Sequence, residues 1–310
     1  MKTIRQLREI LDAGKWVDAH VHTHLCDGSP EMTVQNIGRK AEEVGIDTVV
    51  LTPHFHKQVS DETETLYTDS SDDMFPVLRE EIRRYEKDGG TVRILLSTEA
   101  DILSMDGALS LKLSQEAEGA LDLVSPTLNY HPLLPLKFVH LTYGLDVNAL
   151  HDSGAFLAAA KALGGVGSVL ETMYQAEANA IRRCPYPAML GHLFMTHSVH
   201  PDRYSCFDAK QEHLPLMRRG IAEILRACVQ TGAMIDLTGV HLFPGVTVQE
   251  KLRQNGFLVE FQLQVLRECR RLGVPAFAGS DAHGLHEIGG SDAAYYRYLK
   301  TRLLDEENHD

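Results

Sequence analysis

The chain has 310 residues, of which 44% are hydrophobic and 24% charged, as is usual for a water-soluble globular protein. Its formal net charge of -13 argues against a protein that mainly binds long nucleic acid or an anionic membrane, because such binding depends on clustered Lys and Arg. Five scattered cysteines without a C-x-x-C pair, a charged amphipathic N-terminus and the lack of a membrane-spanning apolar stretch predict a cytoplasmic protein.

Seven apolar runs bounded by Gly, Pro, Asp or Asn are typical of buried β-strands. In chain order they cover about residues 16–21, 46–52, 92–98, 121–126, 188–191, 233–238 and 275–280. The first is followed by a helix start at Ser29-Pro30, with Ser29 as the N-cap, and Gly45 is expected to end that helix. Further amphipathic helices are expected near residues 74–87, 146–162, 168–182, 213–231, 257–272 and 291–303.

This alternation of strand and helix predicts a parallel sheet joined by right-handed crossovers. No low-complexity linker divides the sequence, so we expect a single domain over residues 1–310, with its motifs between about 16 and 290. Seven β/α units suggest a barrel slightly short of the usual eight. In such barrels the reactive groups gather at the carboxyl ends of the strands.

Side chains that bind metals recur where the predicted strands end. Six of the seven strands deliver such a group, in chain order His20 and His22, His54, Glu99, His131, His192, and Asp281 with His283. The sixth strand is less clear, and its Asp236, Thr238 and His241 are left out of the ligand set. Asp18 is expected to support a ligand rather than bind metal. Cys26 is expected to be an inert thiol.

The order of these motifs resembles the PHP (polymerase and histidinol phosphatase) family. The matching motifs are His20-Val-His22, Asp27-Gly28, Thr52-Pro-His54, Glu99, His131, Gly191-His192 and Ser280-Asp281-Ala-His283. The resemblance implies a distorted (β/α)7 TIM-like barrel that holds three divalent ions, which would be Zn, Mn or Fe. The ligands that it implies are His20, His22, Asp27, His54, Glu99, His131, His192, Asp281 and His283.

The resemblance also implies how these ligands are shared. One ion is held by His20, His22, Glu99 and Asp281, a second by Glu99, His131 and His192, and a third by Asp27, His54 and His283. The chain departs from the family pattern in three places, at Pro53, at Asn129-Tyr130 and at the additional His24. His24 or His56 could therefore replace a weaker ligand of the third ion.

The family chemistry implies a hydrolase that cleaves a small phosphomonoester, similar to histidinol phosphate, with a metal-activated hydroxide. Asp281 and His283 are expected to be essential for turnover, and Arg203 is a candidate phosphate contact whose alternative is a solvent-exposed loop residue. The leaving group could be protonated by His197, His241 or His286.

Three alternative functions stay open: a phosphodiesterase for cyclic or short nucleotides, an amidohydrolase-like C–N hydrolase, and a metal-binding domain without turnover. The sequence leaves the oligomeric state open.

Overall fold

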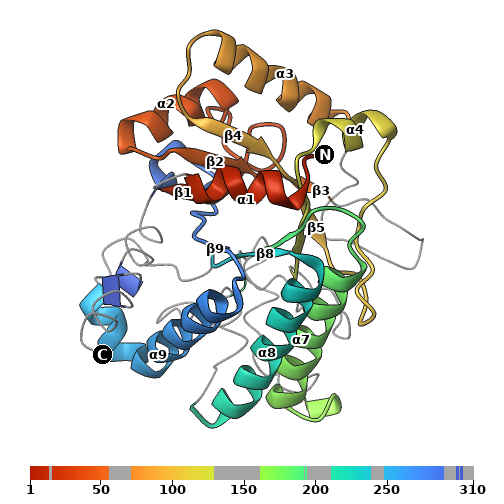
Figure 1. Ribbon diagram of the computed structural model, residues 1–310, viewed down its shortest axis with the longest axis vertical. Coiled ribbons are helices and arrows are strands. Elements are labelled where there is room, and N and C mark those ends of the chain that lie inside the picture. The colour runs from red at the N-terminus through yellow and green to blue at the C-terminus, as the bar shows by residue number, and fades with distance from the viewer. Residues whose placement is uncertain are drawn as a thin grey trace.

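The computed structural model describes residues 1–13, 16–55, 71–128, 161–191, 193, 211–238, 248–289, 298–299 and 301–302. Across these residues strands and helices alternate, and the fold is a mixed α/β fold with parallel sheets (Figure 1). The prediction of an α/β fold is therefore confirmed.

The strands lie in or next to the predicted apolar runs. They are β1 (Val17–Val21), β2 (Thr48–Leu51), β3 (His54–Phe55), β4 (Arg93–Leu96), β5 (Glu99–Asp101), β6 (Ser125–Thr127), β7 (Met189–Leu190), β8 (Met234–Asp236) and β9 (Ala276–Phe277). They form three parallel sheets in the orders β1-β2-β4, β3-β5-β6 and β7-β8-β9. Backbone hydrogen bonds join the sheets, from Met189 N to Val124 O at 3.0 Å and from Ala19 N to Ala278 O at 2.8 Å.

The helices are α1 (Ile4–Ala13), α2 (Val34–Val44), α3 (Met74–Lys87), α4 (Gln115–Ala120), α7 (Val166–Arg183), α8 (Leu214–Thr231) and α9 (Val248–Leu272). Five of them, α2, α3, α7, α8 and α9, coincide with or overlap predicted helices, although α9 begins earlier than the predicted residue 257. Helices α1 and α4 were not among the predicted ones. The helices predicted at 146–162 and 291–303 lie largely outside the described residues.

The predicted start of α2 at Ser29-Pro30 is wrong. The helix begins at Val34, and its N-cap is Thr33, whose hydroxyl accepts a hydrogen bond from Asn36 N at 3.3 Å. Ser29 instead begins a turn, in which its carbonyl accepts a hydrogen bond from Met32 N at 2.8 Å, and its own N–H donates to the carbonyl of His283 at 2.8 Å. The predicted end at Gly45 is confirmed, since this residue has a φ of 81° and its N–H bonds to helix carbonyls.

An apolar layer fills the interior near the beginnings of the strands. Seven chain segments contribute buried side chains to it, Ala19, Val50, Leu95, Leu123, Met189, Met234 and Phe277, and β1 adds Val17. Helix α1 lies across this end and packs Leu7 and Leu11 against the layer (Figure 1). Because Leu7 and Leu11 are four residues apart, they share one helix face.

The residues two positions further along these segments differ in character. Since strand side chains alternate, they point to the same side as the apolar layer. They are Thr52, Ser97, Ser125, Gly191, Asp236 and Gly279. In β1 the pairing register shifts between Asp18 and Val21. Such an irregularity re-aims side chains, and here His20 and His22 follow Ala19 into the interior.

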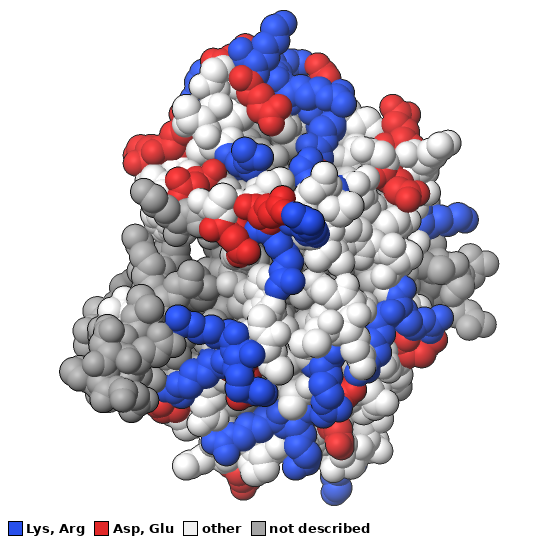
Figure 2. Space-filling model, viewed as in Figure 1, with Lys and Arg blue, Asp and Glu red and all other residues white. Residues whose placement is uncertain are grey.

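On the face seen in Figure 2, Lys and Arg gather over α8 and α9 among acidic residues. Arg226 pairs with Glu223, and Arg271 with Glu268 at 2.6 Å. Such pairs are typical of a solvent-exposed helix surface. Among the helices that the structure describes, none combines the length and the hydropathy that a membrane span requires.

Candidate metal centre

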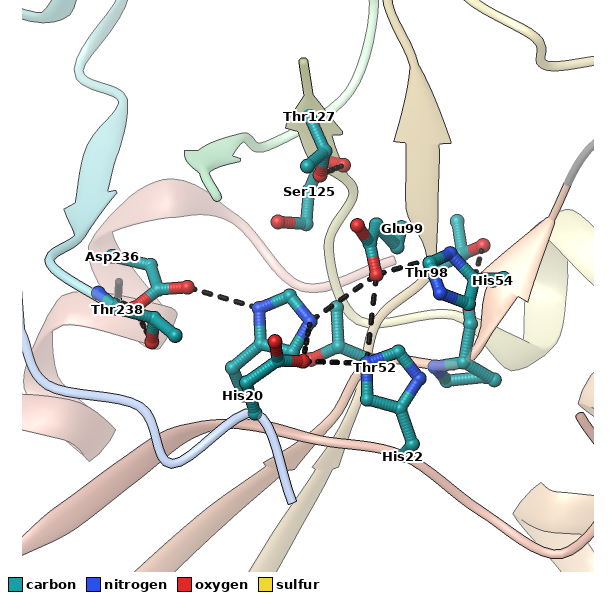
Figure 3. A network of polar contacts seen from close by, with 12 residues as sticks. His20, His22, Thr52, His54, Thr98, Glu99, Ser125, Thr127, Asp236 and Thr238 are labelled. Atoms are coloured by element: carbon teal, nitrogen blue, oxygen red, sulfur yellow. Dashed lines mark hydrogen bonds and ion pairs between the residues drawn. The ribbon is translucent and has the colours of Figure 1, made fainter. Parts of the chain in front are cut away.

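Two candidate ligands lie in one row across the sheet. In the β3-β5-β6 sheet, His54 pairs with Glu99, and Glu99 pairs with Ser125. Register partners in a parallel sheet point to the same face, so the imidazole, the carboxylate and the hydroxyl project into one space (Figure 3). His54 Nδ1 lies 3.2 Å from Glu99 Oε2.

Glu99 joins a buried group with His20, His22 and Asp281. His20 Nε2 lies 3.3 Å from Glu99 Oε2 and 3.7 Å from Asp281 Oδ1. His22 Nε2 lies 2.8 Å from Asp281 Oδ1 and 3.6 Å from Glu99 Oε2. All four residues are buried. The structure thus brings together the four residues that sequence analysis assigns to the first ion.

A second group surrounds Asp27 and is more open. Its carboxylate lies 2.9 Å from His283 Nε2, 3.1 Å from His54 Nε2 and 3.0 Å from His22 Nδ1. The side chains of Asp27 and His283 are each 29% exposed, whereas that of His22 is 1% exposed. This group contains the three residues assigned to the third ion. His22 lies between the two groups.

The loop after β1 depends on Gly28 to place Asp27. The N–H groups of Cys26 and Gly28 both donate to the carbonyl of Thr23 at 3.1 Å, which forms a tight turn. A Cβ atom on Gly28 would stand only 2.7 Å from that carbonyl oxygen. The turn that carries the Asp27 carboxylate therefore requires glycine at position 28.

Asp281 has a strained backbone. Its φ of 53° lies in the left-handed region, which Asp tolerates better than most residues. The Asp281 N–H donates to the carbonyl of His20 at 2.9 Å, and His283 Nδ1 donates to the carbonyl of Asp281 at 2.8 Å. This conformation turns the Asp281 carboxylate towards His22 and directs His283 Nε2 towards Asp27.

Two glycines make room for the polar side chains. A Cβ atom on Gly279 would stand 2.5 Å from the Cβ of His20 and would also overlap the hydroxyl of Thr238. A Cβ atom on Gly191 would stand 2.7 Å from the Ser125 hydroxyl and 2.9 Å from that of Thr127. Both glycines lie on the interior side of the strands, where any larger residue would displace the cluster.

The charges of the cluster are tightly coupled. Burial alone would lower the pKa of His20, but hydrogen bonds to Asp236 and Glu99 outweigh it and raise the pKa to about 10. Burial also opposes protonation of His22, yet the charge of Asp27 holds its pKa well above the usual value. Despite burial, the charge of His22 holds the pKa of Asp27 well below its usual range. The Asp27 carboxylate thus stays ionised and attracts positive charge.

The donor set fits divalent cations. Imidazole nitrogens and carboxylate oxygens bind zinc at about 2.0 to 2.2 Å, which places two ligands of one tetrahedral ion about 3.3 to 3.6 Å apart. The N···O separations of 2.8 to 3.7 Å in the buried group bracket this range. One nitrogen or carboxylate oxygen from each of His22, Asp27, His54 and His283 likewise lies within 4.8 Å of the others, and the same holds for His20, His22 and Asp281.

Two buried carboxylates support the cluster from outside. Asp18 accepts hydrogen bonds from the backbone N–H of Ser280 at 2.8 Å and of Gly289 at 3.3 Å, so it holds the loop of Asp281. Burial raises the pKa of Asp18 to about 6. Asp236, which sequence analysis left out, lies 2.9 Å from His20 Nδ1 (Figure 3). Its position near the end of the sixth predicted strand was the one feature of the sequence that could have indicated a place beside the cluster.

Other candidates lie away from the cluster. His24 faces Glu81, with Nε2 at 3.5 Å from its carboxylate, so the expectation that it could replace a ligand finds no support in its position. The His286 side chain is 85% exposed. Burial raises the pKa of the Cys26 thiol, which favours the unreactive form. The remaining candidates, His56, His131, His192, His197, Arg203 and His241, lie outside the described residues.

No protein-family model and no curated protein matches the chain. Two of the solved structures that are similar to it are histidinol phosphatases by name. One is HisK from Listeria monocytogenes, named for histidinol phosphatase activity, with 16% identity, a TM-score of 0.60 and coverage of 90% of this chain and 99% of that one. The other is the histidinol phosphate phosphatase of Lactococcus lactis subsp. lactis Il1403, complexed with zinc, L-histidinol and phosphate. It shows 15% identity, a TM-score of 0.53 and coverage of 93% of both chains. At this identity the likeness establishes a shared fold.

Proposed function

We propose that this protein is a metal-dependent phosphoesterase that hydrolyses a small phosphomonoester. The observation that carries the proposal is the convergence of four imidazoles and three carboxylates at or just beyond the carboxyl ends of β1, β2, β4 and β9, with separations that suit shared divalent ions. The shared fold with two histidinol phosphatases supports phosphate esters as the substrate class.

We assign three ions, of Zn, Mn or Fe, to this centre. The first would be held by His20, His22, Glu99 and Asp281, and the third by Asp27, His54 and His283, which are the groups found close together. Glu99 would share the second ion with His131 and His192, which sequence order alone supports.

Divalent ions in such a site activate water as a nucleophile and offset the charge of a phosphate ester. The chain supplies the geometry around them. Asp281 and His283 are tied together through the Asp281 carbonyl, so loss of either would disturb the other. The partial exposure of Asp27 and His283 marks the side from which a substrate would enter. Arg203 stays a candidate phosphate contact in the loop that follows His192.

We further propose that the chain is a single domain over residues 1–310 whose strands close into a distorted (β/α)7 barrel. Hydrogen bonds between neighbouring segments support closure, because they run from β1 through β2, β4, β6, β7, β8 and β9 and return from Ala278 to Ala19. The apolar layer beneath the polar cluster also suits a barrel interior. A cytoplasmic location and a substrate similar to histidinol phosphate belong to the same proposal.

The test is phosphate release by protein reconstituted with Zn, Mn or Fe. The panel contains phosphomonoesters, among them histidinol phosphate, and phosphodiesters. Variant His283→Ala should lose turnover, whereas His213→Ala should keep it because His213 lies at the start of α8 and contacts Glu212. Monoester turnover with this pattern supports the proposal.

Other outcomes would replace it. Activity on diesters alone would indicate a phosphodiesterase. Release of ammonia from an amide substrate without ester cleavage would indicate a C–N hydrolase. Tight metal binding without hydrolysis would indicate a domain that has no turnover.

A further inference from the structure

Asp236 approaches the candidate metal centre from behind one of its ligands. Its side chain is fully buried, and its Oδ2 lies 2.9 Å from His20 Nδ1. The other ring nitrogen, Nε2, faces Glu99 and Asp281. The two nitrogens of this imidazole therefore have different partners, one in the centre and one outside it (Figure 3).

We propose that Asp236 is a positioning residue that keeps the proton of neutral His20 on Nδ1, so that the Nε2 lone pair is available to a divalent ion. The inference rests on the proposed metal centre. A neutral imidazole carries one N–H and one lone pair, and an ionised carboxylate can only accept. A hydrogen bond between Nδ1 and the Asp236 carboxylate thus requires the proton on Nδ1.

Thr238 fixes the orientation of this carboxylate. Its backbone N–H donates to Asp236 Oδ1 at 2.8 Å, and its hydroxyl donates to the same oxygen. With Oδ1 engaged by both donors, Oδ2 is the oxygen that faces His20. Thr238 is itself buried, so this arrangement is shielded from competing water.

This geometry predicts an unusual order of variants. In Asp236→Asn the amide has a single acceptor oxygen, which the two Thr238 donors would claim. The amide NH₂ would then face His20 Nδ1, which must accept, and the ring proton would move to Nε2. In Asp236→Ala no amide NH₂ forces Nδ1 to accept, and Nε2 can still offer its lone pair to an ion in place of its contact with Glu99. The near-isosteric Asn variant should therefore bind metal less well than the Ala variant.

The experiment measures zinc affinity of the full-length protein by competition with a chelator. We expect affinity to fall about 10-fold in Asp236→Ala and about 100-fold in Asp236→Asn, the range typical of partners behind metal ligands. Asp122→Asn is the matched control, because Asp122 is a buried carboxylate that pairs with Arg79 and Lys2 instead. Thermal melting of each metal-free variant verifies folding, and ¹⁵N NMR of the histidine rings in the zinc-bound protein reports the tautomer.

An Asn variant that binds zinc as well as or better than the Ala variant would overturn the inference, as would wild-type affinity in both. Wild-type protein that binds no zinc would refute the inference together with the metal centre. The protein could show the predicted order of zinc affinities and yet hydrolyse no phosphate ester. This result would support the role of Asp236 and refute the proposed function, so the two failures are distinguishable.

Discussion

The two ends of the strands carry opposite chemistry within a few residues. At the beginnings of the strands, side chains such as Met189, Met234 and Phe277 form a dry apolar layer closed by α1. Polar residues stand four positions after residues of this layer: Glu99 after Leu95, Thr238 after Met234, and Asp281 after Phe277. An even spacing along a strand puts side chains on the same face. One set of strands therefore supports a stabilising core at one end and a polar cluster at the other.

The comparison indicates that the apolar end of the strands stabilises the fold, whereas the polar end carries the candidate metal centre. Burial of apolar surface favours folding, whereas burial of charged groups costs free energy unless they are paired. The polar cluster is buried and rich in carboxylates and imidazoles, so it depends on protons or cations for its balance of charge. Variants at the two ends should consequently separate activity from stability.

The largest expected effect is at Glu99, whose Oε2 lies within 3.2 to 3.6 Å of three imidazoles. Loss of a residue that only supports a metal ligand typically lowers activity about 10- to 100-fold. Variant Glu99→Gln should lose more activity than this, because Glu99 faces the centre directly. Metal content and kcat on a cleaved phosphomonoester are the measurements. Asp101→Asn, a change at a buried carboxylate two residues later, is the matched control. A fully active Glu99→Gln would remove this residue from the centre.

The next effect lies at the other end. Met234→Ala removes a fully buried side chain from the apolar layer and should lower the free energy of unfolding by about 2 to 5 kcal/mol. The kcat of the remaining folded protein should stay near the wild-type value. Met234→Leu, which conserves volume, should cost less than about 1.5 kcal/mol. Denaturant titration measures the free energy of unfolding of both variants. A Met234→Ala protein with unchanged stability but low kcat would contradict the separation of stability and activity between the two ends.

Sequence reasoning located the strands and several candidate ligands because two local patterns agree at these positions. Apolar runs mark the strands, and His20, His22, Glu99 and Asp281 stand where the runs end. The resemblance to the PHP family predicted the same grouping that the distances show for the buried group.

The features that escaped prediction depend on contacts that are distant in sequence. Asp236 lies 216 positions from His20, and no local pattern connects them. The register shift in β1, which turns His20 inward after Ala19, is set by pairing with β2. Ser29 is a plausible helix cap until its bond to His283 is known. Tertiary contacts decide each of these cases.

A third prediction concerns pH, and it should affect only the polar end. In metal-free protein the folded-state pKa of His20 is about 10 against an unfolded value of 6.5, so its contribution to stability is complete below about pH 6.5 and is lost as pH rises towards 10. The pKa of His22 shifts in the same direction. Asp18, with a raised pKa of about 6, titrates below this window.

Metal binding should reverse this trend, because ions compete with protons for the imidazoles and bind more tightly as pH rises. Urea denaturation between pH 6.5 and 9.5, with chelator and with zinc, measures both trends. In Met234→Ala the slope should match the wild type. Equal slopes with chelator and with zinc would show that the imidazoles do not bind the ion.

The smallest expected effect distinguishes two buried serines. Ser110 Oγ donates to the carbonyl of Phe55 at 2.9 Å and accepts from Asp101 N at 2.9 Å, so Ser110→Ala should cost about 1 to 3 kcal/mol. Ser125 Oγ is buried beside Glu99 in the register and has no hydrogen-bond partner within the described part of the chain. Ser125→Ala should therefore change the stability of the metal-free protein by less than about 1 kcal/mol. Denaturant titration of the two variants checks this difference, and equal losses would show that the Ser125 hydroxyl already takes part in a hydrogen bond of the folded chain.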